Sequence, residues 1–333
     1  DLVLGRLGTP IHREEVETFL REHGVHAAAW CSADLVNVLD RWNAPTLARV
    51  NRTLINGRMI SRPEVDTLIA NVEKDPVTLL SPGAGYAKSS VLADFVQRLR
   101  ERGVPTAVIR LDSIEPMTSR QLGRSMGLAE SPALVLGNDG PGILVLDQLD
   151  AVSVTSGRNP RLRPLLHELL AEASQVPSLR VVLACRSFDL EFDDELRTLA
   201  QSPETRRIDV GLLDIDDVGA ALTVAGVTRD QLRSEHVEIL RVPRNLYMFT
   251  KIAATRRATV ISEIGLFDSY WETVGRNVRE RSQSNDFASA LALIAAEMGR
   301  REALWVPNAI LDRYGALRDS LASEAVITVH DQR

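Results

Sequence analysis

The chain has 333 residues, of which 44% are hydrophobic and 25% charged, and its formal net charge is −6. These proportions exclude collagen-like, disulfide-scaffold and wholly disordered proteins, and no apolar run approaches the ~18 residues needed to span a bilayer. Cys31 and Cys185 are too few for a disulfide framework, so we expect a cytoplasmic protein without a membrane partner, whose acidity gives no global attraction to nucleic acid.

The first 58 residues are predicted to be an N-terminal helical segment or linker. Residues 12–24 have apolar side chains spaced by three and four, which is typical of an amphipathic helix. Ser32 is placed to cap a second helix over residues 33–42, and a third helical pattern over 43–55 follows a turn. This region carries no catalytic pattern.

From residue 59 the pattern changes to strands that alternate with helices. Most of the predicted strands are separated by helical patterns, such as the amphipathic run over 88–103. The strand runs are apolar throughout, as expected of strands that are covered on both faces. This alternation predicts a parallel α/β sheet over residues 59–213, with strands at 76–80, 104–112, 142–147, 179–185 and 205–213.

After residue 213 the predicted strands give way to short helices. Residues 214–281 are predicted to form a helical domain. Three further helical patterns and a strand-like run at 325–329 predict a truncated winged-helix domain over 282–333. The chain ends without a natural-looking stop, so we expect it to be part of a longer protein.

The strongest chemical signal is LLSPGAGYAKSSVL, residues 79–92, between a predicted strand and a predicted helix. Phosphate-binding loops need this context, because the N–H groups of a flexible loop and of the helix N-terminus converge on the phosphates. Lys88 is placed to reach the terminal phosphates, and the hydroxyl of Ser89 is placed to hold Mg²⁺. Only three of the 39 basic residues are lysines, which makes this placement informative. We assign nucleotide binding to Gly83, Ala84, Gly85, Tyr86, Ala87, Lys88, Ser89 and Ser90.

This loop departs from the standard spacing G-x-x-x-x-G-K-[ST] at two positions. The spacing places glycines where this chain has Pro82 and Ala87. Alanine adds one methyl group, whereas proline removes an N–H donor and fixes φ. The alternative interpretation is a glycine-rich turn between strand and helix with an incidental lysine.

Two acids follow the apolar run at 142–147. A carboxylate at a strand end beside a phosphate loop can hold the hydration shell of Mg²⁺, and a second can orient or deprotonate the attacking water. Asp147 is therefore a candidate metal ligand together with Ser89, and Asp150 is the candidate catalytic base. The alternative is an Asx turn after a buried strand.

Arg186 follows the apolar run at 179–185 and is a second catalytic candidate. An arginine there can sense the γ-phosphate and stabilise charge in the transition state. The alternative is a surface ion pair with Asp189. Arg158 lies in a polar loop at 152–161, where we favour a solvated loop tip over contact with a neighbouring subunit's nucleotide.

The order of these motifs resembles the STAND signal-transduction ATPases, including the NACHT group, within the AAA+ class. The resemblance covers residues 57–333: a P-loop with Lys88 and Ser89, DQLD after one strand, ACR after the next, then helices. It implies an α/β fold with a P-loop AAA+ type parallel sheet, a helical domain and a partial winged helix. It also implies ATP or ADP with Mg²⁺ as cofactors.

The resemblance implies further contacts with the base. Ile60 and Arg62 occupy the segment that lies near the adenine in this family, and Pro243 occupies the place of a proline that packs on the base. The alternatives are a surface residue at a helix start for Arg62 and a first-turn proline for Pro243.

Two further positions differ from the family pattern. The family often has an acid directly after the second aspartate, whereas this chain has Ala151, which together with Pro82 leaves the rate of hydrolysis open. His330 superficially offers the winged-helix histidine that contacts the β-phosphate in relatives, but we favour a position beyond residue 333 for that histidine.

By resemblance, the chain is a nucleotide-controlled switch with ATP and Mg²⁺ bound between the sheet and the helical modules. Bacterial members of the family are sensors, often in antiviral defence, that self-associate when a foreign ligand binds. We expect slow ATP hydrolysis, self-association through the nucleotide-binding domain, and a foreign protein ligand held by regions outside this chain. The alternatives are an AAA+ protein that holds DNA through its winged helix and a scaffold that retains nucleotide without hydrolysing it.

Overall fold

The computed structural model describes residues 32–333 except for 56, 84, 139, 155–159, 229–231, 254–261, 302–305, 325, 328 and 330–333. The helix predicted at residues 12–24 therefore lies outside the described residues. No helix among the described residues combines the length and the apolar character needed to cross a membrane.

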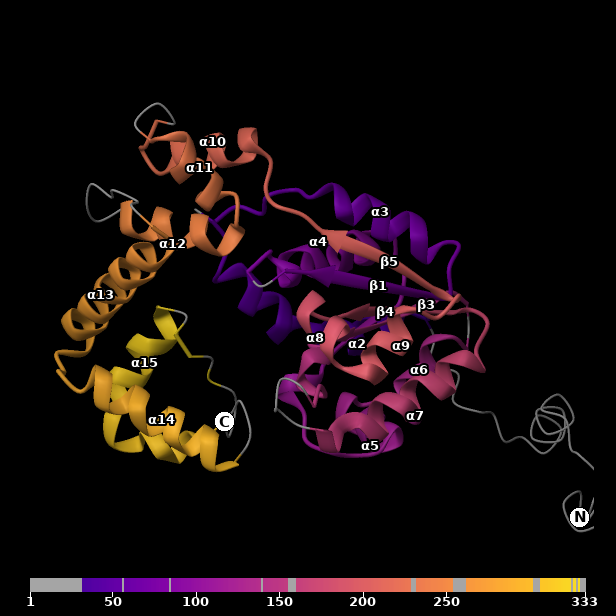
Figure 1. The fold of residues 1–333 in the computed structure, drawn as a ribbon. Coiled ribbons are helices and arrows are strands. Elements are labelled where there is room, and N and C mark those ends of the chain that lie inside the picture. The colour runs from indigo at the N-terminus through magenta and orange to yellow at the C-terminus, as the bar shows by residue number, and fades with distance from the viewer. Residues whose placement is uncertain are drawn as a thin grey trace, which may run out of the picture.

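A five-stranded parallel sheet forms the centre of the chain (Figure 1). Its strands lie in the order β2-β3-β4-β1-β5. The first strand of the chain, β1, therefore lies between β4 and the edge strand β5, and β2 forms the other edge. All five strands predicted from the sequence are present. Their bounds are β1 Val77–Pro82, β2 Thr106–Arg110, β3 Gly142–Asp147, β4 Leu179–Ala184 and β5 Thr205–Val210.

Helices cover both faces of this sheet, because successive residues of each strand point to opposite sides. Leu79 packs into one apolar cluster and Leu80 into the other. One face is covered by α3 (Pro63–Val72) and α4 (Lys88–Glu101), and Figure 1 shows the other face covered by α5 (Ser119–Met126), α6 (Pro132–Leu136) and α7 (Arg163–Ser174). Helices α8 (Ser187–Phe192) and α9 (Asp194–Ala200) follow β4. Short 3-10 turns lie at Leu111–Ser113, Leu149–Ala151 and Pro160–Leu162.

The edge strand β5 differs from the sequence prediction of uniformly apolar strands. It ends at Val210 instead of residue 213, and only Ile208 and Val210 are buried. Arg206, Arg207 and Asp209 are exposed. Charged residues suit an edge strand, because they discourage pairing with another chain.

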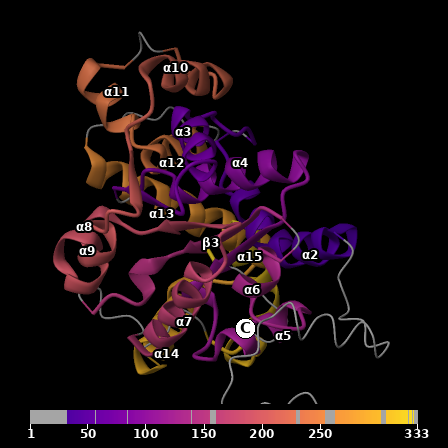
Figure 2. The same cartoon turned by 90° about the vertical axis from the view of Figure 1, so that its right-hand side faces the viewer.

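At the opposite edge of the sheet, α2 (Ser32–Asn51) lies along β2. The predicted turn between two helices is wrong, because α2 continues through Pro45 as one helix. Its side chains replace a missing strand: the Asn43 side chain donates to Thr106 O (2.8 Å) and accepts from Val108 N (2.9 Å), and Trp42 Nε1 donates to Val108 O (2.8 Å). These bonds and the packing of Leu39 in the core hold the helix despite the proline. Figure 2 shows α2 on the opposite side of the molecule from α8 and α9.

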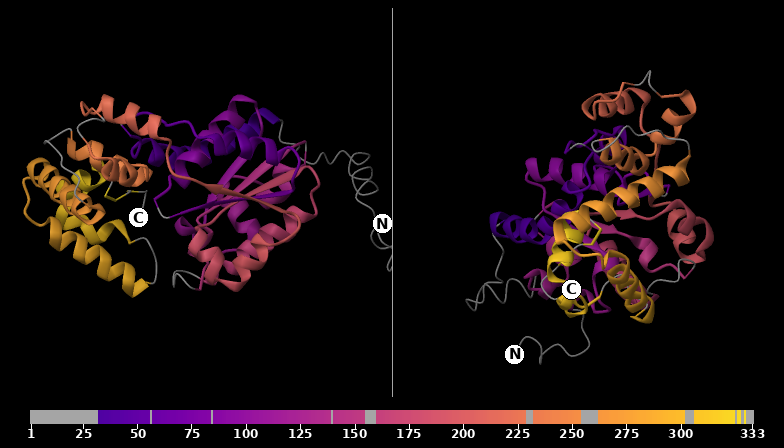
Figure 3. Two further views of the ribbon diagram at one scale, coloured as in Figure 1. Left: turned by 45° about the horizontal axis from the view of Figure 1, so that its top comes forward. Right: turned by 90° about the vertical axis from the view of Figure 1, so that its left-hand side faces the viewer.

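The C-terminal part of the described chain is helical (Figure 3). Its α-helices bury two further apolar clusters, one centred on α10 to α12 and one on α13 to α15. Val326, Ile327 and Val329, the described residues of the predicted strand at 325–329, are not in a strand. The winged helix and the predicted domain boundaries therefore stay predictions. The helices are α10 Ile215–Val224, α11 Ser234–Leu240, α12 Pro243–Ala253, α13 Glu263–Ser282, α14 Phe287–Arg301 and α15 Gly315–Ser323, with a 3-10 segment at Asn308–Tyr314.

Candidate functional site

The sequence motifs meet at the carboxyl edge of the sheet. Strand β4 lies between β3 and β1, so the three strands end side by side. The loop after β1 leads to Lys88, β3 ends at Asp147, and Arg186 follows β4. Ligands of open α/β sheets bind at this edge.

The loop between β1 and α4 bends through two residues with positive φ. Gly85 has φ +84°, and Ala87, directly before the helix, has φ +61° and ψ +34°. A Cβ in this left-handed region costs about 1 kcal/mol, which is why the standard motif has glycine at the position of Ala87. Pro82 is the last residue of β1, where it lies beside Val210 of the edge strand β5. Ala84 lies outside the described residues.

Lys88 is buried at the start of α4 and forms two ion pairs. Its Nζ lies 3.1 Å from Asp147 Oδ1 and 3.3 Å from Asp150 Oδ1. Burial acts to lower the pKa of Lys88, but the two carboxylates outweigh it and raise this pKa above its ordinary value. The lysine is therefore charged, and it compensates two carboxylates that are themselves buried.

Asp150 is engaged on both of its oxygens. Besides Lys88 on Oδ1, Arg186 Nε lies 3.3 Å from Oδ2. The ion pair between Arg186 and Asp150 differs from the surface pair with Asp189 that the alternative interpretation proposed. In this arrangement Asp150 is held between two cations.

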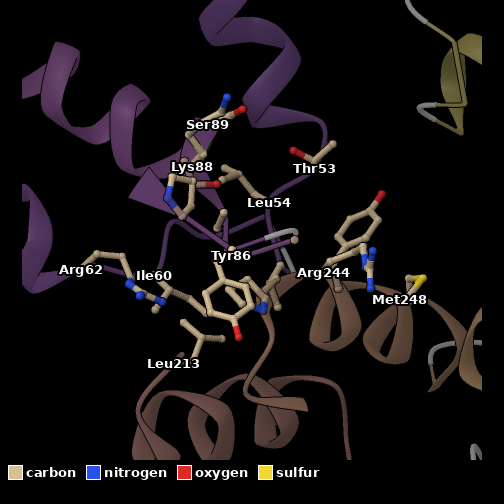
Figure 4. A pocket seen from close by; sticks show the side chains of 18 of the residues that line it. Thr53, Leu54, Ile60, Arg62, Tyr86, Lys88, Ser89, Leu213, Arg244 and Met248 are labelled. Carbon is tan, nitrogen blue, oxygen red and sulfur yellow. The ribbon is translucent and has the colours of Figure 1, made fainter. Parts of the chain in front are cut away.

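A cavity of about 470 Å³ opens at this edge and is lined both by the sheet region and by the C-terminal helices. Figure 4 shows Ile60, Arg62 and Leu213 on one side, with Tyr86 between them and Arg244. Of the residues predicted to bind nucleotide, the cavity is lined by Ile60, Arg62, Gly83, Gly85, Tyr86, Ala87, Lys88, Ser89, Ser90 and Pro243. The candidate Arg186 also lines it, whereas Asp147 and Asp150 lie behind Lys88.

One nitrogen of the Arg62 guanidinium group forms no hydrogen bond among the described residues. Its Nε and Nη2 donate to the carboxylate of Glu64 (3.1 and 2.8 Å), and Nη2 also donates to Gly211 O (2.7 Å). Its Nη1 is buried and has no hydrogen-bond partner among the described residues. Burial acts to raise the pKa of Glu64, but Arg62 and the N–H of Gly211 outweigh it and lower this pKa. An unpaired buried donor beside a cavity suits an acceptor atom of a ligand.

The C-terminal helices touch the loop between β1 and α4 directly. The backbone N–H of Arg244, in the first turn of α12, donates to Gly85 O (3.1 Å), and Arg244 Nη2 lies 2.7 Å from Glu263 Oε1 of α13. Tyr247 and Tyr270 line the same cavity. Burial raises the pKa of both phenols, and for Tyr270 the neighbouring Tyr247 raises it further. The two phenols are therefore neutral at ordinary pH.

Sequence reasoning missed several of these cavity residues. Arg244, Tyr247 and Tyr270 belong to no recognisable sequence motif, because residues from a distant helix have no fixed spacing from the loop between β1 and α4. Gln148 was also missed, although its place between the two candidate acids was visible in the sequence. Arg158 and His330 lie outside the described residues.

The residues at the cavity also fit a nucleotide-bound Mg²⁺ ion. Among the described residues, no group of three or more His, Cys, Asp or Glu side chains forms a metal cage. Mg²⁺ does not need one, because it is usually held by one or two carboxylates, water and substrate phosphates. The hydroxyl of Ser89 on the cavity wall and the buried carboxylate of Asp147, which contacts Lys88, are donors of this kind.

Together, these elements form an α/β fold whose five-stranded parallel sheet has the strand order typical of an AAA+ core, followed by C-terminal helices. No family model and no curated protein matches the sequence.

Three solved structures illustrate what the fold is similar to. A Walker-type ATPase of Pyrococcus abyssi has 17% identity and a TM-score of 0.43, over 84% of this chain and 93% of that chain. AMPPCP-bound DnaA from Aquifex aeolicus has 12% identity and a TM-score of 0.37, over 83% and 90%. A STAND protein with a tetratricopeptide repeat sensor from Pyrococcus horikoshii has 11% identity and a TM-score of 0.40, over 80% and 39%. Likenesses this distant add no argument about function.

Proposed function

We propose that this chain binds ATP and ADP with Mg²⁺ in the cavity at the carboxyl edge of the sheet and hydrolyses ATP slowly. The observation that carries the proposal is the position of Lys88, a buried cation at a helix N-terminus, on the wall of a cavity that a nucleotide would fit. A charged lysine beside a loop of backbone N–H groups is the arrangement that binds terminal phosphates.

Each part of the cavity has a role in this proposal. Lys88 and the loop backbone bind the phosphates, and Ser89 and Asp147 hold Mg²⁺, which shields the phosphate charges when bound. Ile60 and Pro243 offer apolar contact to the base, and the spare Nη1 of Arg62 donates to a base acceptor. A purine base supplies such acceptors at its ring nitrogens.

Slow hydrolysis is supported by the state of Asp150. Its Oδ1 pairs with Lys88 and its Oδ2 with Arg186, so both oxygens are already engaged by cations and the carboxylate is poorly placed to take a proton from water. The next residue is Ala151, which offers no second acid. Phosphate positioning by Lys88 and Arg186 would therefore supply more of the rate than proton removal.

The proposal predicts different effects for the two acids. Asp147→Asn should lose the Mg²⁺-dependent part of ATP affinity, about tenfold, because an amide is a poor ligand for Mg²⁺. Asp150→Asn, the matched control, should keep that part and reduce turnover, because a neutral amide retains the shape of the side chain but positions Lys88 and Arg186 less firmly. Calorimetric titration of each variant with ATP, in the presence of Mg²⁺ or of EDTA, would measure the affinities. An assay of phosphate release would measure turnover. An unchanged Mg²⁺ dependence in Asp147→Asn would contradict the assignment.

The same site supports a nucleotide-controlled switch of the STAND type. The cavity is shared by the sheet and the C-terminal helices, and Arg244 bonds directly to the phosphate loop. A nucleotide that touches both parts favours one arrangement over the other by its difference in affinity for the two. Self-association, a foreign protein ligand and a role in bacterial antiviral defence belong to this proposal through the sequence resemblance.

We expect the switch to change the shape or mass of the protein in solution. Samples with ADP, with a slowly hydrolysed ATP analogue and without nucleotide should give distinguishable scattering profiles or masses, because the ligands contact both sides of the shared cavity differently. Three indistinguishable profiles at confirmed occupancy would favour the scaffold interpretation.

Binding of DNA through the C-terminal helices receives less support. Several arginines there are paired with acids: Arg281 with Glu324 (3.0 Å), and Arg300 and Arg301 with Glu297 (2.5 Å each). Paired guanidinium groups give a weaker attraction to a phosphate backbone than free ones.

A further inference from the structure

Gln148, between the two acids after β3, has an unusual backbone conformation. Its φ is +63° and its ψ is +45°, in the left-handed region that glycine adopts freely and glutamine rarely does. Two hydrogen bonds hold it there: its N–H donates to Asp147 Oδ1 (2.7 Å), and its carbonyl accepts from Ala151 N (2.8 Å). Glycine would make both bonds without strain, so the turn itself does not require a glutamine.

Gln148 is one of the residues that line the cavity. Lys88, Ser89 and Arg186 line the same cavity. The residue is partly buried, and its side-chain amide has no hydrogen-bond partner among the described residues. A strained backbone thus presents an unpaired amide beside the groups that would bind the terminal phosphate. Strain of this kind gathers at functional sites.

The acids next to it leave a role open for this amide. Both oxygens of Asp150 are engaged by cations, and Asp147 accepts from Lys88 and from the N–H of Gln148. In the proposed site Asp147 is occupied by Lys88 and Mg²⁺ and Asp150 by two cations, so another group is needed to orient the attacking water. A glutamine amide carries an acceptor and two donors, so it can accept from a water and donate to a phosphate oxygen at the same time.

We infer that Gln148 orients the attacking water against the γ-phosphate of ATP. This inference rests on the proposed function and extends it to a residue that touches the reacting atoms. The water oxygen forms a bond to the γ-phosphorus, the bond from that phosphorus to the β–γ bridging oxygen breaks, and the electron pair leaves with ADP. The water proton ends on the phosphate product, and the amide gains and loses no proton. Placing a water and a phosphate in line is how positioning accelerates this reaction.

The test uses two glutamines in the same backbone region. Gln148→Gly removes the amide and relieves the strained φ, so ATP hydrolysis should fall about 100-fold while the midpoint of thermal unfolding stays or rises. Gln283→Gly is the matched control, because Gln283 also has a positive φ (+51°) but is exposed at the end of α13, away from the cavity. It should keep the parent's rate and shift the thermal midpoint in the same direction.

Two binding measurements separate this role from simple nucleotide binding. In Gln148→Gly, the dissociation constant for Mg²⁺ with a non-hydrolysable ATP analogue should change less than about twofold, whereas that for ADP with aluminium fluoride should rise at least about tenfold, because the latter mimics the transition state. Parent-like hydrolysis in Gln148→Gly, equal losses for both ligands, or a parent that binds ATP without hydrolysing it would each overturn the inference. A parent that binds no nucleotide would instead refute the proposed function, and the inference with it.

Discussion

Lys88→Ala should lower the affinity for ATP with Mg²⁺ about 10- to 150-fold. This range corresponds to the roughly 1.5–3 kcal/mol of a charge-assisted hydrogen bond to phosphate. Calorimetric titration of the parent and the variant would measure it. Lys74→Ala is the matched control, because Lys74 is exposed and does not line the cavity. Equal affinities in the parent and in Lys88→Ala would place the phosphates elsewhere.

The same substitution should destabilise the protein without nucleotide by about 3 kcal/mol, because it leaves Asp147 and Asp150 buried without Lys88. Urea unfolding would measure this loss. The double variant Lys88→Ala with Asp150→Asn should recover part of the free energy of unfolding but none of the affinity, which separates charge compensation from phosphate binding. A double variant as unstable as the single one would contradict this explanation.

The contribution of Lys88 to stability also has a predictable pH range. Its pKa is raised in the folded protein above the ordinary value of 10.5. A raised pKa means that the folded state holds the proton more tightly than the unfolded state, so the contribution is complete below pH 10.5 and is lost as the pH rises through the folded value. The difference in stability between the parent and Lys88→Ala should therefore shrink in strong alkali.

Gly123→Ala should cost about 3 kcal/mol of folding free energy, because the new Cβ would overlap the carbonyl oxygen of Glu130. Gly123 lies inside α5, and the overlapping atom belongs to the backbone that leads into α6, so no side-chain rotation can relieve the contact. Denaturant unfolding would measure the loss.

The same substitution at Gly299 should have the opposite sign. Gly299 is exposed in α14, and outside its own turn of helix no atom of the described residues lies within 4 Å of a Cβ built there. Alanine should stabilise that helix by about 0.5–1 kcal/mol, because it restricts the unfolded chain and favours the helix. A gain in stability of similar size at both positions would show that general helix propensity, and not the approach of Glu130, governs the effect at Gly123.

The sheet and the position of Lys88 at the start of a helix could be predicted because their signals are local. Strands buried on both faces are short apolar runs, and Lys88 follows one of them across a glycine-containing loop. The edge strand β5 was predicted with the wrong pattern and length, because the order of strands in space, which decides which strand is exposed, is not encoded locally.

Other features depend on contacts between distant segments. The continuity of α2 through Pro45 depends on hydrogen bonds to β2 that offset a local preference for a break. The hydrogen bond from Arg62 to Gly211 O joins two residues that are 149 positions apart in the sequence. The left-handed conformation of Gln148 is set by its neighbours in the turn, and its residue type gives no sign of it.

The hydrogen bonds from α2 to β2 decide where this chain can be shortened. Asn43 and Trp42 occupy backbone groups of Thr106 and Val108 that an added strand would otherwise use. A version that begins after residue 51 would leave that edge of the sheet open, while the opposite edge keeps its charged residues. Copies of such a fragment would associate by pairing strands at this open edge. The mass of the fragment in solution would then reflect the missing helix, and not which nucleotide is bound.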